Sequence, residues 1–243
     1  MLPLDVLRPI PPDGPVPRTL AWLLLGVALM PSACSREALP EICPVIEEGE
    51  LVISELRAAD GDTFGHYIEL YNAAGKTVDL QGLHIIQRES GGDVIDIFVR
   101  ESLEVAAGDY VVIGPGGDEQ GESINAWIDY ALRWDISGGT PDPDEDESFR
   151  YPDNFLRSSS AFIELEACGE LIDEVFYGPT TLGSLPLPED GSLACGNADN
   201  PPRAEDNDNA ATGCWCVDEA GIEDQPFAGV GLPGSPGSPN RCP

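Results

Sequence analysis

Seven cysteines offer the clearest chemistry in this sequence, and their number is odd. They are Cys34, Cys43, Cys168, Cys195, Cys214, Cys216 and Cys242. Setting the first aside leaves six, which can form three disulfides in an oxidising compartment, although the sequence does not resolve their connectivity. Zinc is the competing interpretation, but the closest pair is C-W-C, no C-x-x-C is present, and His66 and His84 are far away in the sequence. Cys214 and Cys216 are expected to pair elsewhere rather than with each other.

An apolar run precedes the first cysteine. Residues 20–30 read LAWLLLGVALM and follow Arg8 and Arg18. The run is too short to span a bilayer, and its order of charged, apolar and small residues is typical of a bacterial signal peptide. We therefore predict a signal peptide over residues 1–33.

The end of that signal, PSAC, is similar to a lipobox, whose cysteine is diacylated on sulfur and becomes the new N-terminus. Ser32 and Ala33 match the two positions before Cys34, whereas Pro31 departs from the usual Leu, Ile or Val. The prediction is lipidation of Cys34 and a tether over residues 34–47. The alternative is ordinary cleavage near Ala33, with Cys34 free or disulfide-bonded.

Catalytic chemistry has little support. His66 could act as a base with Asp60, Asp62 or Glu69 nearby, but it opens an expected strand and the chain has no G-x-S-x-G. A histidine that packs or hydrogen-bonds at a sheet end is the simpler interpretation. No catalytic residue and no enzymatic activity are predicted.

Calcium is the one cofactor that the carboxylates suggest. The candidate ligands are Asp142, Asp144, Asp146 and Asp153. The loop is not an EF-hand, because Glu147 replaces the turn glycine and position twelve is an aspartate. A looser calcium site there or at AEDNDN (204–209) is one expectation, and a solvated acidic loop is the other. A calcium-dependent extracellular hydrolase or adhesin is the corresponding alternative function.

The charge balance limits the partners. The chain has 44 acidic and 12 basic residues, for a formal net charge of −32. Such a field repels nucleic acid, so no nucleic-acid partner is expected, and membrane contact is expected through the lipid alone. Hydrophobic residues make up 42% and gather in short segments, which favours a packed core over disorder.

Short apolar runs separated by Gly, Asp and Asn predict an all-β domain. The expected strands are 50–56, 66–72, 83–89, 93–100, 109–114, 160–167 and 171–178. In HYIELYN, alternation places Ile68 and Leu70 on one face and Tyr67, Glu69 and Tyr71 on the other. Seven such strands predict a β-sandwich.

Two turns and two irregular regions complete the pattern. NAAGK (72–76) is expected to reverse the chain, with Gly75 able to take a positive φ, and CGE (168–170) is expected to form a hairpin tip. Within an insertion over 118–160, apolar spacing predicts a short helix at 123–136 that covers an edge of the sandwich. The tail, 179–243, is expected to be an irregular cover held by its cysteines.

Several motifs, taken in order, resemble the lamin-tail domain family. They are LVISEL (51–56), YIELYN (67–72), VDLQGLHI (78–85), LEVAAGDYVVIG (103–114), FIELEACGELIDEVFYG (162–178) and LPGSPGSPN (232–240). The resemblance implies an immunoglobulin-like β-sandwich over 48–242. It also implies a non-catalytic protein-interaction or surface structural module, with a partner that it does not name.

The sequence also predicts where the protein is located and how one disulfide is paired. The signal segment places the protein in a bacterial cell envelope or outside the cell, and Ser35 after the lipid cysteine favours the outer membrane by analogy with well-studied bacteria. Cys43 is expected to pair with Cys242, because the termini of a sandwich often lie close together.

Overall fold

The computed structural model describes one folded unit of the chain, within Glu41–Pro243. The described residues are 42–58, 66–89, 92, 94–115, 127–132, 156, 159–188, 191–211, 213–218 and 234–243. The predicted signal peptide, Cys34, most of the tether and the calcium candidates Asp142, Asp144, Asp146 and Asp153 lie outside this set. In the described residues the fold is all-β, with only two short helical turns, η3 (Thr180–Leu182) and α1 (Ala204–Asn207).

The larger sheet has six strands. In spatial order these are β12 (Trp215–Asp218), β11 (Ser192–Cys195), β1 (Leu51–Arg57), β2 (Tyr67–Asn72), β7 (Tyr110–Pro115) and β8 (Tyr130–Leu132). Neighbouring strands are antiparallel except β7 and β8, which are parallel.

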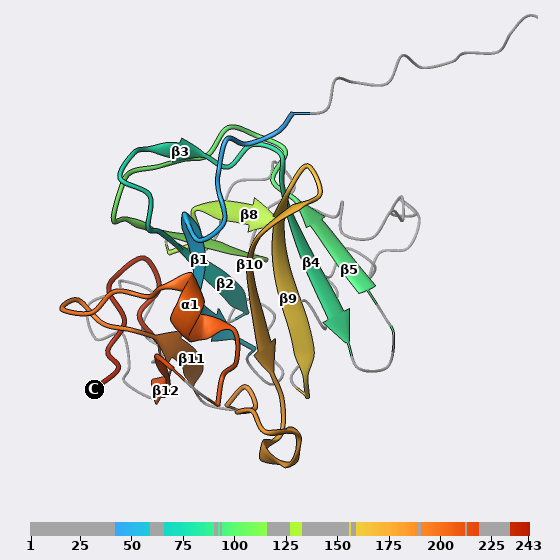
Figure 1. The fold of residues 1–243 in the computed structure, drawn as a ribbon, viewed down its shortest axis with the longest axis vertical. Helices are drawn as coiled ribbons and strands as arrows, with labels where there is room; N and C mark the ends of the chain where they lie inside the picture. The colour runs from blue at the N-terminus through green and yellow to red at the C-terminus, as the bar shows by residue number, and fades with distance from the viewer. Residues whose placement is uncertain are drawn as a thin grey trace, which may run out of the picture. The chain divides into compact units, whose positions relative to one another are not determined.

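The second sheet has four antiparallel strands, which lie side by side in Figure 1. Their order is β10 (Glu170–Tyr177), β9 (Ala161–Ala167), β4 (Leu83–Glu89) and β5 (Val94–Phe98). A short two-stranded sheet of β3 (Val78–Asp79) and β6 (Glu104–Val105) completes the architecture.

Both larger sheets contribute to one hydrophobic core. Ile53 and Ile68 come from the six-stranded sheet and Ile85 and Ile163 from the four-stranded sheet, and all four are fully buried. Along β9, alternation places every second side chain in this core. Removing these side chains from water is the main favourable term that holds the sheets together.

The seven predicted strands are confirmed, with bounds that differ by two residues at most. The hairpin tip at 168–170 is also confirmed: Cys168 and Gly169 both have positive φ, 50° and 83°. Positive φ at both central residues is the geometry of a type I′ turn, which suits the twist of a hairpin. Gly75 does not use the positive φ that is open to a glycine.

The helix predicted at 123–136 is wrong over the described residues 127–132, where the chain forms β8 on the edge of β7. The Asp129 N–H donates to the Val112 carbonyl (3.0 Å), and the Val112 N–H donates to the Asp129 carboxylate (2.8 Å). The apolar residues of this segment do not lie on one face of a helix. Trp127 packs on the outer side of the sheet with Val112, and Leu132 joins the main core.

The tail is also more regular than predicted. Instead of forming only an irregular cover, it supplies β11 and β12, which extend the six-stranded sheet beyond β1. Trp215 of β12 is buried, and its indole N–H donates to the Asn207 carbonyl at 2.8 Å. No helix in the described part of the chain is long and apolar enough to cross a bilayer.

Candidate functional site

Three disulfides join the six cysteines from position 43 onward. The pairs are Cys43–Cys168, Cys195–Cys214 and Cys216–Cys242, with Cα atoms 5.6, 4.7 and 5.6 Å apart. Cys43 therefore joins the tip of the β9–β10 hairpin and not Cys242 as expected. Cys242 is held instead beside β11, where its Sγ lies 3.0 Å from the Ala194 carbonyl.

Cys214 and Cys216 belong to different bridges, as expected. Since every other cysteine is used, Cys34 has no cysteine of its own chain left to pair with. Disulfides persist in oxidising compartments, so the three pairs indicate an extracytoplasmic setting.

Two glutamates face each other on the outer side of the six-stranded sheet. Glu55 of β1 is the direct cross-strand neighbour of Glu69 of β2, and both are fully buried. Like charges directly opposite each other destabilise a sheet, so this pair requires compensation. Ser54 donates its hydroxyl to Glu69 at 2.7 Å, and Ser192 donates its hydroxyl to Glu55.

The C-terminal segment 234–243 supplies the rest of the compensation. The Ser235 N–H donates to Glu55 (3.1 Å), and the Gly237 N–H donates to Glu69 (2.7 Å). Gly234 lies so close that a Cβ there would meet the Tyr67 hydroxyl and the Glu55 carboxylate. The two acids thus hold the end of the chain against the sheet.

Burial changes the acidity of this pair. Loss of solvation raises the pKa of Glu55 to about 7, more than the hydrogen bonds from Ser192 and Ser235 lower it. Burial, and then the charge of Glu55, raise the pKa of Glu69 well above its usual value. Raised pKa values often mark catalytic acids, but these carboxylates are covered by the chain itself and are closed to a substrate.

A third buried acid joins the two sheets. Asp173 of β10 accepts the Ile53 N–H at 2.7 Å and the Asn207 side-chain amide at 2.8 Å. Burial raises the pKa of Asp173 to about 7 despite these bonds. Asn207 also donates to the Ile53 carbonyl, at 3.1 Å. One side chain of the AEDNDN segment (204–209) is therefore buried and used in the core.

The two histidines have different settings. His66 is buried, and Asp60 and Asp62, its suggested partners, lie outside the described residues. His84 is on the outer face of the four-stranded sheet, where its Nε2 lies 2.9 Å from Asp96 and its Nδ1 lies 3.5 Å from Glu166. Across the described ranges, no group of three or more His, Cys, Asp and Glu side chains is arranged to hold a metal ion.

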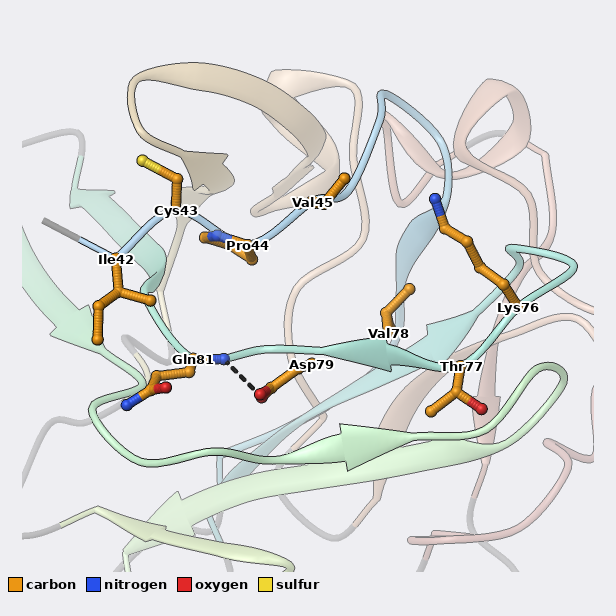
Figure 2. Close-up of a pocket in the computed structure, with 9 residues that line it drawn as sticks. All are labelled: Ile42, Cys43, Pro44, Val45, Lys76, Thr77, Val78, Asp79 and Gln81. Atoms are coloured by element: carbon orange, nitrogen blue, oxygen red, sulfur yellow. Dashed lines mark hydrogen bonds between the residues drawn. The ribbon is translucent and has the colours of Figure 1, made fainter.

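A shallow pocket of about 300 Å³ opens between residues 42–45 and the segment that contains β3 (Figure 2). Its acid, Asp79, accepts the N–H groups of Gln81 (3.1 Å) and Leu103 (2.9 Å). Burial acts to raise the pKa of Asp79, but these bonds and one from Ser102 outweigh it and lower the pKa. Lys76 on the rim is 3.1 Å from Glu50. The polar groups of the pocket therefore stabilise the local loop.

The outer face of the four-stranded sheet is different, because it leaves large apolar side chains in solvent. Val94, Phe98, Phe162 and Leu171 are each exposed by more than two fifths. The sequence analysis places these residues in strands but does not predict an exposed apolar face. The signal for such a face is that they alternate with buried isoleucines, which are Ile95, Ile97, Ile163 and Ile172.

No protein-family model matches the chain. A search of curated proteins likewise finds no significant match.

Proposed function

We propose that the chain is a non-catalytic, exported domain of the lamin-tail type, held on a bacterial envelope membrane by lipid on Cys34 and acting as an interaction module. The observation that carries the proposal is the pairing of all six other cysteines, which leaves Cys34 over. A thiol that is reserved from disulfide chemistry and follows a signal-like apolar run fits acylation.

The arrangement of motifs supports the domain type. LVISEL forms β1, YIELYN forms β2, and FIELEACGELIDEVFYG forms the β9–β10 hairpin. Two sheets around one core are what an immunoglobulin-like sandwich requires. The buried acids are taken up by contacts within the fold. The apolar outer face of the four-stranded sheet is exposed, and this exposed face supports an interaction role.

Acyl labelling tests the anchor. The full chain is expressed in a Gram-negative host with an alkyne fatty acid, beside Cys34→Ser and the control Ser35→Ala. We expect labelling of the native chain and of Ser35→Ala, its loss in Cys34→Ser, and accumulation of the precursor with globomycin. An unlabelled native protein that is released in soluble form would overturn the lipid anchor.

Sorting gives a second readout. If the anchor is present, Ser35 should allow transfer to the outer membrane, and Ser35→Asp should retain the protein in the inner membrane. Sucrose-gradient separation of the two membranes measures this. Equal distribution of the two forms would contradict the outer-membrane assignment and leave the anchor in place.

A further inference from the structure

The outer face of the four-stranded sheet presents two apolar rows. In the first, Phe98, His84, Glu166 and Leu171 lie side by side across the strands. In the second, the neighbours are Val94, Arg88, Phe162 and Phe176. Half of the eight exposed large apolar side chains of the described chain lie in these rows. Exposed apolar patches of this kind mark interaction sites.

The aromatic rings of the two rows are held in place before any partner binds. The ring of His84 stacks on Phe98, with centroids 4.2 Å apart and an interplanar angle of 5°. Phe162 lies against Phe176 with centroids 4.7 Å apart. Rings that are already fixed lose little side-chain entropy on binding, which favours affinity.

An acidic row separates the apolar rows. It contains Asp96, Ile86, Glu164 and Glu174, which are cross-strand neighbours. Arg88 compensates only part of this charge, through its Nε at 2.7 Å from Glu164. With Glu166 in the first row, the face carries four carboxylates against one arginine and one histidine, so a complementary partner is cationic.

The spacing defines the partner more closely. Residues two apart on a strand are about 7 Å apart, so the two apolar rows are about 13 Å apart with the acids midway. An extended peptide has the same two-residue repeat. Four strands and three rows cover about 400 Å², which is less than the roughly 800 Å² that each side of a stable globular interface buries. The face therefore suits a short segment.

We propose that this face docks a cationic protein segment with the pattern apolar, x, Lys or Arg, x, apolar, whose basic side chain lies over the acidic row. The chain's own acidic loop is a poor occupant, because residues 140–148 carry five carboxylates and would be repelled. This inference rests on the proposed interaction role and adds the chemistry of the partner.

Three fluorescent peptides test the proposal on the soluble full mature chain with Cys34→Ser. The probe peptide alternates Phe, Arg and Phe with Ser; one control replaces both Phe by Ser, and the other replaces Arg by Glu. Fluorescence anisotropy should show binding of the probe at least about tenfold tighter than either control, with a decline as salt screens the charge.

The variants locate the binding. Phe98→Ser with Phe162→Ser should weaken the probe at least about tenfold, and Asp96→Asn should weaken it and reduce its salt dependence. Val217→Ser is the matched control, because Val217 is exposed by 45%, like Phe98, but lies on β12 of the other sheet. Circular dichroism confirms that each variant is folded.

Equal binding of the three peptides, or an equal loss in Val217→Ser, would overturn the proposal. Binding of a neutral polysaccharide that Phe98→Ser abolishes would reassign the face to glycans. Because the protein in this test carries Cys34→Ser, a negative peptide-binding result does not contradict the lipid anchor. A negative acylation result, in turn, does not contradict the docking face.

Discussion

At the scale of single residues, the orientation of Glu69 can be predicted from the sequence, but the burial of the pair Glu55 and Glu69 cannot. Alternation places Glu69 opposite the core side of its strand, and the structure confirms this orientation. Alternation also predicts a solvated carboxylate there, whereas both Glu55 and Glu69 are fully buried. The cover comes from Ser235, which is 180 residues beyond Glu55, and no local pattern reports so distant a contact.

The raised pKa of Glu55 predicts a pH-dependent stability. Its pKa rises from 4.5 to about 7 in the folded protein, so the folded state keeps a proton that the unfolded chain releases. This contribution is fully present below the unfolded pKa and is lost as the pH rises through about 7. The melting temperature should therefore be higher near about pH 5 than near about pH 8. Glu55 alone contributes on the order of 3 kcal/mol to the corresponding difference in the free energy of unfolding.

Glu55→Gln tests the assignment, because the amide does not ionise. Calorimetry across the same pH range should show a smaller slope than in the native protein, while Asp173 and Glu69 keep part of it. The exposed Glu104→Gln is the control and should retain the full slope. An unchanged slope in Glu55→Gln would assign the pH dependence to other groups.

At the scale of elements, the seven longest strands could be predicted because alternation and glycine turns agree over five or more residues. β8 could not, since its three residues are too few to show a period and Trp127, Ile128 and Leu132 also fit helical spacing. β11 and β12 have four residues each and lie in a proline-rich tail. Pairing with neighbouring strands, rather than intrinsic preference, makes them strands.

The disulfides predict an order of stability among elements. Cys43–Cys168 closes a loop with a sequence separation of 125, and Cys195–Cys214 closes one of 19. Because a longer closed loop restricts the unfolded chain more, removal should cost about 5 kcal/mol for the first pair and about 3 kcal/mol for the second.

Double Cys→Ala variants at each pair, unfolded with urea under identical conditions, measure the two costs. The variant without Cys195 and Cys214 serves as the control for the loss of a bridge as such. If its cost equals or exceeds that of the Cys43–Cys168 variant, local packing rather than loop length determines the contribution of the bridges.

At the scale of the whole molecule, the net charge of −32 predicts a dependence on salt. Self-repulsion destabilises a compact acidic chain, and counterions screen it. The melting temperature should rise by a few degrees between low and physiological ionic strength. A melting temperature that is constant with sodium chloride would show that the acidic residues are too dispersed to matter.

The same melting experiment can separate calcium binding from charge screening. Calcium chloride and magnesium chloride at matched ionic strength should give equal melting temperatures if screening alone acts. A saturable extra rise with calcium would support a site at Asp142, Asp144, Asp146 and Asp153, and Asp144→Asn should then remove it.

The bridge from Cys43 to the β9–β10 hairpin also has a mechanical meaning. A pull on the chain ahead of residue 43 passes through a covalent bond to Cys168 before it reaches β1. At the other end, Cys242 is bonded to Cys216 of β12. Tension on a membrane tether would thus be carried by covalent bonds rather than by the hydrogen bonds of the first strand. The domain should resist unzipping from its N-terminal end until a reductant cuts the bridge.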